Sequence, residues 1–214
     1  MSQKVQTLYS QAHASTRRSG CGERPEGVFG RHIIPASGEV TIPLSNVQRR
    51  IWLEEQFAQG VPLFREILLL QLPEQIDVDA LNRAFSAVIE RHEVLRVTFK
   101  VANAQPIQTL TECKWAGLRV TESTAQTEQG RTSEIQRIAT QEFQQSFDLA
   151  QSPLIRAQLL CFRPGASVLV LTLHGLVADE HSLHILRREL FAFYRSFSED
   201  KPCSLPELPI QFAD

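Results

Sequence analysis

The chain has 214 residues, of which 43% are hydrophobic and 21% are charged, and its formal net charge is −2. These values are typical of a globular protein, and the length allows one or two domains. The sequence contains no run of about 18 apolar residues and no apolar core of a signal peptide, which excludes a transmembrane helix and a secretory signal. The balanced charge argues against a nucleic-acid partner.

Cysteine spacing indicates the redox compartment. The four cysteines form no CxxC pair and lie far apart, at Cys21, Cys113, Cys161 and Cys203. We therefore expect free thiols in a reducing cytoplasm.

Residues 1–40 differ in composition from the rest of the chain. They are rich in Ser, Gly, Gln and Arg and show no sustained apolar periodicity. We interpret them as a flexible leader, with a docking segment for another protein as the alternative. Residues 41–214 form the predicted folded unit.

The first predicted helix begins after Ser45. Ser45 and Gln48 have the spacing of a capping box, in which each side chain bonds the other residue's backbone amide. We expect the helix to end near Gly60 and to bury one apolar stripe. The stripe comprises Val47, Ile51 and Phe57.

A strand and an amphipathic helix are predicted next. Residues 63–72 have the apolar composition of a strand that is buried on both faces. Asp77 then caps a helix that runs to about His92, with apolar residues at nearly ideal helical spacing. These residues are Leu81, Ala84, Phe85, Val88 and Ile89.

The middle of the chain predicts strands and a loop. Residues 95–101 alternate between apolar and polar side chains, as in a half-buried strand. Weaker strands follow near residues 107–110 and 118–121, and residues 122–131 have the polar composition of a loop.

The last third predicts two helices around two strong strands. Ser133 with Gln136 forms a second capping box that begins a helix, and Ser182 caps another. Residues 154–162 and 167–173 predict adjacent antiparallel strands. The mixture predicts an α+β fold with one sheet and helices layered on it.

The segment from His174 to Glu180 is the candidate functional site. It joins the most apolar strand to a helix, and such junctions hold side chains on rigid elements. His174 and Asp179 are the reactive candidates, because histidine can act as a general base near neutral pH. A buried structural histidine is the alternative. His181 and His184 lack the pattern of a third ligand, so no metal site is expected.

Three segments together resemble condensation domains of nonribosomal peptide synthetases. The segment SNVQRRIW at 45–52 resembles the family's SxAQxRLW, and RHEVLRVTF at 91–99 resembles RHExLRTxF. Residues 174–180 lie where the family has HHxxxDG. The likeness covers residues 42–214.

The resemblance implies a chloramphenicol-acetyltransferase-like lobe, with a mixed sheet and layered helices. Residues 41–214 would be the N-terminal lobe of a two-lobe domain. Such domains join a carrier-bound acyl or peptidyl donor to an aminoacyl acceptor through an amide bond. The implied partners are peptidyl or acyl carrier proteins, adjacent synthetase domains and a C-terminal lobe, with no nucleic acid and no membrane. No metal or cofactor is expected to bind directly, because the phosphopantetheine arms belong to the carriers.

Position 175 departs from the family motif. The second motif histidine is the one assigned to catalysis, and Gly175 occupies its position. His174 matches the first, mainly structural histidine. Asp179 matches an aspartate that pairs with an arginine to hold the loop, with Arg96 and Arg50 as candidate partners. The resemblance therefore implies impaired amide formation.

Two other functions remain open. The chain can be a non-catalytic docking module of a synthetase assembly line, or a carrier-independent acyltransferase of the same superfamily. The sequence ends where a second lobe would begin, so we expect a truncated product, an excised piece or completion by another chain.

Overall fold

The computed structural model describes residues 41–58, 61–112, 115–162, 165–212 and 214. The predicted leader 1–40, Gly60 and two of the four cysteines, Cys21 and Cys113, lie outside the described residues. Within the described part of the chain, no helix is long and apolar enough to cross a bilayer.

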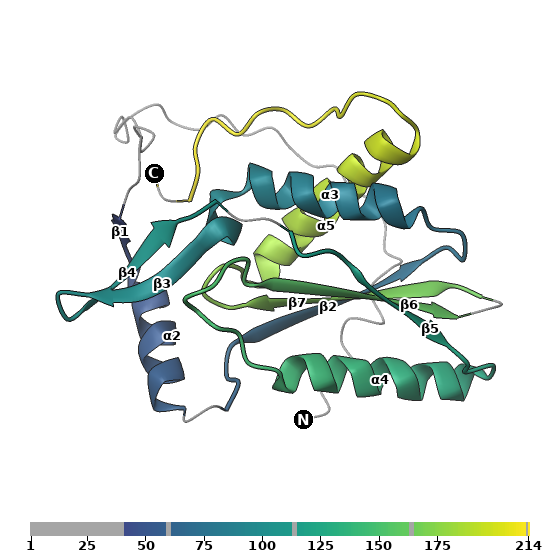
Figure 1. The fold of residues 1–214 in the computed structure, drawn as a ribbon, viewed down its shortest axis with the longest axis horizontal. Coiled ribbons are helices and arrows are strands. Elements are labelled where there is room, and N and C mark those ends of the chain that lie inside the picture. Colours follow the sequence, from purple (N-terminus) through teal and green to yellow (C-terminus); the bar gives the residue numbers. More distant parts are fainter. Residues whose placement is uncertain (1–40, 59–60, 113–114, 163–164, 213) are drawn as a thin grey trace, which may run out of the picture. The chain divides into compact units, whose positions relative to one another are not determined.

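The main sheet has four strands in the order β2-β7-β6-β5 (Figure 1). Strand β7 pairs antiparallel with β2 and β6, whereas β5 pairs parallel with β6, which confirms the predicted mixed sheet. The strands are β2 (Arg65–Leu72), β5 (Arg119–Ser123), β6 (Ile155–Phe162) and β7 (Ser167–His174).

A second, smaller sheet shows that the prediction of a single sheet is wrong. It comprises β1 (Thr41–Pro43), β4 (Gln105–Leu110) and β3 (Val97–Ala102), in that order. Asn103 and Ala104 connect β3 to β4, and both have positive φ, as in a tight hairpin turn. Strands β3 and β4 therefore form a hairpin, and β4 also pairs with β1.

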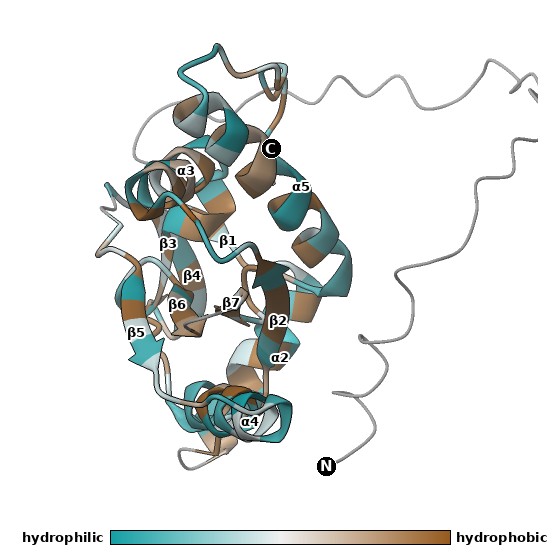
Figure 2. Cartoon of the chain, turned by 90° about the vertical axis from the view of Figure 1, so that its right-hand side faces the viewer, coloured by the Kyte–Doolittle hydropathy of each residue, from teal (hydrophilic) through white to brown (hydrophobic). Residues whose placement is uncertain are grey.

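Helices are layered on the main sheet, as predicted, and they cover both of its faces. Helices α3 (Val78–Arg91) and α5 (Glu180–Ser198) lie on one face, and α4 (Glu128–Gln144) lies on the other (Figures 1 and 2). All five residues of the predicted α3 stripe are buried, and they form one core with α5 and the sheet. Ile138 of α4 packs in a separate cluster on the opposite face.

Helix α2 (Asn46–Phe57) has the predicted capping box but not the predicted buried stripe. Val47 is 68% exposed and Phe57 is 81% exposed, whereas Gln48 is only 3% exposed. Ile51 is partly buried against the core. The inward face of α2 is therefore partly polar, because its buried side chains serve hydrogen bonds described below.

The predicted strand 95–101 begins two residues later than expected. Leu95 lies in the 3-10 helix η2 (Glu93–Arg96), and the strand starts at Val97. The predicted alternation is also wrong, because Thr98 is buried and Val101 is exposed.

Two predicted helix starts are wrong. Thr127, not Ser133, caps α4, and its hydroxyl accepts a hydrogen bond from the Gly130 amide at 3.1 Å. The predicted loop 122–131 is therefore too long, because residues 122–123 belong to β5 and residues 128–131 to α4. Asp179, not Ser182, caps α5. In each case a second residue of capping type lies within the first helical turns, and sequence spacing alone does not distinguish the two.

The corrected start of α4 can be tested by two substitutions. Thr127→Ala removes the capping oxygen and should lower the free energy of unfolding by about 1 kcal/mol. Ser133→Ala lies on an exposed part of the helix and should change it by less than about 0.5 kcal/mol. Urea denaturation measures both values, and the reverse order would contradict the assigned cap.

Candidate functional site

The loop that follows β7 is held by hydrogen bonds from within and from α2. The Leu176 amide donates to Nδ1 of His174 at 3.1 Å, and the Val177 amide donates to the His174 carbonyl at 3.0 Å. From α2, the buried Gln48 side chain donates to the Leu176 carbonyl at 3.0 Å. The motif at residues 45–52 therefore holds the loop that contains the motif at residues 174–180.

Gln48 also ties the loop to the small sheet. Its amide group lies 3.3 Å from the Gln108 amide oxygen, and the Gln108 amide in turn donates to the Pro43 carbonyl at 3.3 Å. Because Gln48 and Gln108 are each 3% exposed, these polar groups have protein partners in place of water.

His174 is a buried imidazole with both ring nitrogens hydrogen bonded. The residue has no exposed surface, and its Nε2 lies 2.8 Å from Oε1 of Glu55. Because Nδ1 accepts from the Leu176 amide, the ring proton is on Nε2 and is donated to Glu55. The Glu55 carboxylate also pairs with Nη1 of Arg65 at 2.6 Å.

Burial controls the protonation of this group. Burial lowers the pKa of His174 to about 4, and the nearby Arg65 and Arg156 cations act in the same direction, against the hydrogen bond to Glu55. For Glu55, burial favours the neutral acid, but hydrogen bonds from Arg65 and His174 outweigh it and lower the pKa of the carboxyl. The pair at neutral pH is a neutral imidazole and a carboxylate.

Gly175 offers only its backbone to the site. Its amide donates to the Phe64 carbonyl at 3.1 Å. A Cβ at position 175 would lie 3.1 Å from Cβ of Phe64, so a larger residue needs a small displacement of Phe64.

Asp179 lies at the exposed end of the loop. Its carboxylate accepts hydrogen bonds from the Ser182 hydroxyl at 2.6 Å and from the Ser182 amide at 2.8 Å, and these bonds lower the pKa of Asp179. Arg50 pairs with Glu54 on the surface at 2.7 Å. Arg96 has a buried Nε without a hydrogen-bond partner. Within the described residues, no ion pair joins Asp179 to either predicted arginine partner.

The structure adds residues that the sequence analysis missed. Glu55 and Arg65 contact each other directly, and Gln48 and Glu55 are seven residues apart, which places them on one face of α2. That spacing of two polar residues was the available signal. The ring of Phe147 meets His174 edge-on, with ring centres 5.9 Å apart. The sequence contains no local signal for that contact.

The motif at residues 91–99 contacts α5, on the other face of the main sheet from α4. Nε of Arg91 lies 2.9 Å from Oε2 of Glu189 in α5, and Nε2 of His92 lies 2.8 Å from the same oxygen. Arg91 also donates to the Pro206 carbonyl at 2.6 Å. This motif therefore fixes α5 and the extended segment that follows it.

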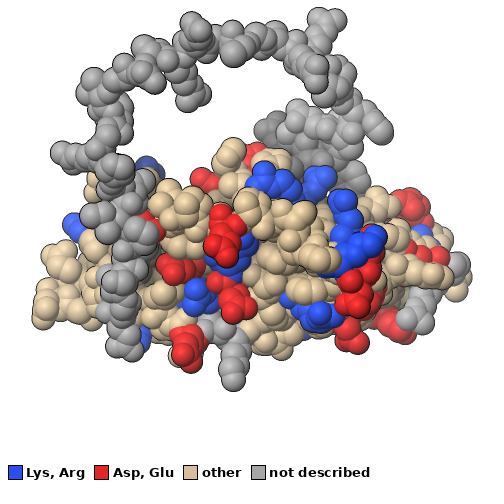
Figure 3. Space-filling model, turned by 90° about the horizontal axis from the view of Figure 1, so that it is seen from above, with Lys and Arg blue, Asp and Glu red and all other residues tan. Residues whose placement is uncertain are grey.

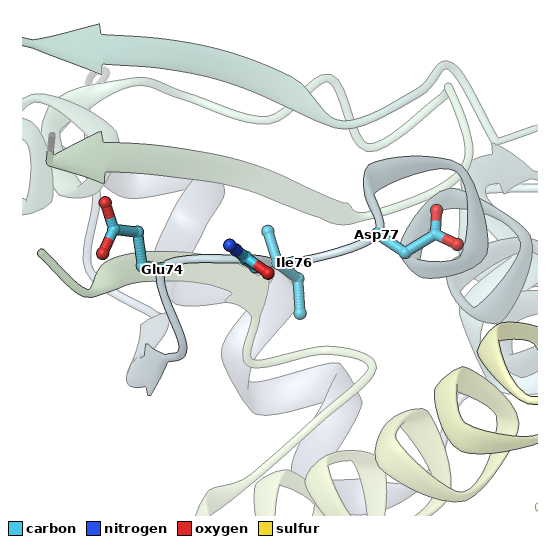
Figure 4. A pocket seen from close by; sticks show the side chains of 4 residues that line it. Glu74, Ile76 and Asp77 are labelled. Atoms are coloured by element: carbon cyan, nitrogen blue, oxygen red, sulfur yellow. The ribbon is translucent and has the colours of Figure 1, made fainter. Parts of the chain in front are cut away.

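A surface hollow lined by residues 74–77 lies away from the loop (Figure 4). The hollow follows Leu72, the last residue of β2, which pairs with Ser167. His174 lies at the other end of this strand pair, opposite Arg65. Figure 4 shows Glu74 and Asp77 well separated along this segment, so they do not converge on one ligand. On the face shown in Figure 3, acidic and basic side chains are interspersed.

His174 should make stability depend on pH. The unfolded histidine binds a proton below about pH 6.5, whereas the folded one stays neutral to about pH 4, so stability falls as pH decreases through that window. The loss at pH 4 should reach about 3 kcal/mol. Urea denaturation of His174→Gln should show a flatter profile, while the exposed control His184→Gln should retain the slope. Equal slopes would contradict the assignment.

Known proteins are similar to this chain in sequence. The family profile named Condensation domain matches residues 39–214. Chondramide synthase cmdD of Chondromyces crocatus is 35% identical over 173 residues, which are 81% of this chain and 4% of that protein. Phosphinothricin tripeptide synthetase PhsC of Streptomyces viridochromogenes is 33% identical over 173 residues, 81% of this chain and 16% of that protein. The chain therefore spans only a small part of the length of these relatives.

Solved structures confirm the predicted fold class and the coverage of one lobe. The starter condensation domain of rhizomide synthetase RzmA superposes with a TM-score of 0.72 at 21% identity, over 80% of this chain and 43% of that one. A chain from the complex of the X-domain and OxyB from teicoplanin biosynthesis gives 0.73 at 26% identity, over 87% and 40%. The chain therefore belongs to the condensation-domain family of nonribosomal peptide synthetases.

Proposed function

We propose that residues 41–214 form the N-terminal lobe of a condensation domain with reduced amide-forming activity. The domain would join a carrier-bound acyl or peptidyl donor to an aminoacyl acceptor. The observation that carries the proposal is the pairing of a buried, neutral His174 with a side-chain-free Gly175. The loop then holds its shape but has no side chain at position 175, where the family motif places the residue that accepts a proton from the attacking amine.

The proposed reaction explains why position 175 matters. The amine nitrogen attacks the thioester carbonyl, a C–N bond forms, the thiolate leaves, and the nitrogen loses a proton that the thiolate can take up. A positioned general base typically accelerates such a step by about 10²- to 10⁴-fold. Without it, holding donor and acceptor together still supplies rate. In this proposal His174 and Asp179 support the loop, and Gly175 marks the lost base.

The proposed partners follow from the family. They are the acyl or peptidyl carrier proteins, whose phosphopantetheine arms present both substrates, together with adjacent synthetase domains and a C-terminal lobe. We place the protein in the cytoplasm and expect no nucleic-acid or membrane partner. Residues 1–40 are proposed as a flexible leader or docking segment.

A non-catalytic docking module is the second candidate function. Both ring nitrogens of His174 keep the hydrogen bonds that hold the loop, although Gly175 provides no base. A binding role needs the shape of the loop but not the base. A similar chain also comes from a structure in which an X-domain is in complex with OxyB. In this case the lobe would bind a synthetase partner without turnover.

Restoring the motif histidine tests the first proposal. Gly175→His in the native polypeptide that contains this lobe should raise single-turnover amide formation by about 10²-fold or more. Gly175→Ala is the matched control and should give no rise. Because a Cβ at 175 would lie 3.1 Å from Cβ of Phe64, the double variant Gly175→His/Phe64→Gly, which removes that atom, should match or exceed the single one. Transfer between carriers is followed by intact-protein mass spectrometry, and no rise in either histidine variant would contradict the proposal.

Binding without turnover tests the second function. The 214-residue chain is titrated with a carrier protein or an adenylation domain in a calorimeter, and the heats should give a saturable isotherm. A flat isotherm at high partner concentration would reject the docking role.

A further inference from the structure

We propose that Arg65 is the positioning residue that holds the His174–Asp179 loop in register with β2. This inference deepens the proposed function, because it names the group that keeps the loop of that site in place. It rests on the contacts of a single guanidinium nitrogen.

Nη1 of Arg65 contacts both anchors of the loop. It lies 2.6 Å from Oε1 of Glu55, the same oxygen that accepts from Nε2 of His174. It also donates to the Phe64 carbonyl at 3.0 Å, and that carbonyl accepts the Gly175 amide at 3.1 Å. One nitrogen therefore fixes the acceptors of two consecutive loop residues.

The location of Arg65 makes these contacts strong. Arg65 is the first residue of β2 and is opposite His174 in the antiparallel register. Its side chain is 2% exposed, so little water competes for the guanidinium. The cation also lies 5.3 Å from the centre of the Phe147 ring, which meets His174 edge-on.

Charge balance gives Arg65 a second effect on the loop. The groups that face His174 are Glu55 from α2, Arg65 from β2 and Arg156 from β6. Without the Arg65 cation, the full charge of Glu55 would act on the imidazole and favour its protonation. A protonated Nδ1 could no longer accept the Leu176 amide, so the loop would lose an internal hydrogen bond.

Nuclear magnetic resonance on the full 214-residue chain tests this proposal. Arg65→Met keeps an unbranched apolar side chain and removes the charge and the donors. It should raise the pKa of His174 above about 4 and accelerate hydrogen exchange of the Gly175 and Leu176 amides by about tenfold. Arg188→Met, which alters a side chain that is 71% exposed, is the control and should change neither quantity.

Arg65→Lys provides a conservative variant if Arg65→Met fails to fold. Lysine keeps the positive charge but loses the planar fork, so the pKa of His174 should stay low while the Gly175 amide exchanges faster. Wild-type exchange of that amide in Arg65→Lys, or an unchanged pKa and unchanged exchange in Arg65→Met, would overturn the proposal. Neither readout depends on amide formation, so the outcome is separate from a failure of the proposed function.

Discussion

A largely buried carboxylate at the end of the main sheet determines how the functional loop is built. Glu55 projects from α2 with 11% of its side chain exposed, and a charge in that environment is costly unless it is paired. Arg65 neutralises it and His174 donates to it. Each partner then fixes a neighbouring piece of backbone, so the chain that follows β7 has one favoured arrangement.

This charge pair belongs to a larger polar layer on the α4 side of the main sheet. Arg156 lies 3.8 Å from the centre of the Phe147 ring and donates to the Gln145 carbonyl at 2.8 Å, which satisfies the end of α4. Glu142 pairs with Arg156 and with Arg119. Ionic contacts and ring stacking therefore connect the C-terminal end of α4 to the loop, while the middle of α4 packs through apolar residues around Ile138.

The parts of the fold that depend on local patterns could be predicted from the sequence. The α3 stripe is buried as predicted, and β6 and β7 have the expected antiparallel pairing, because periodic burial is visible along the chain. Helix starts were less predictable, since Thr127 and Ser133 both have capping chemistry and only the structure shows which one caps α4. The small sheet was missed because strand pairing depends on contacts between distant segments.

In the candidate site too, features with a local sequence pattern could be predicted and long-range contacts could not. The position of His174 at a strand end follows from the sequence, but its partner Glu55 lies 119 residues earlier. The spacing of Gln48 and Glu55 indicates a shared polar face of α2, but it does not show which residue that face contacts. Within the described residues neither predicted arginine pairs with Asp179, whose carboxylate instead caps α5 through Ser182. Long-range polar pairing is set by tertiary packing, and one sequence does not reveal it.

In the proposed function His174 is a neutral, buried support and not a base. The most direct measurement is the nitrogen resonance pattern of the His174 ring in the wild-type chain, followed from about pH 8 to about pH 5, a range that spans the ordinary histidine pKa. We expect a proton on Nε2, an unprotonated Nδ1 and no titration across that range. Titration near the ordinary value of about 6.5, or a proton on Nδ1 at neutral pH, would contradict it and make His174 available as the proton acceptor of the site.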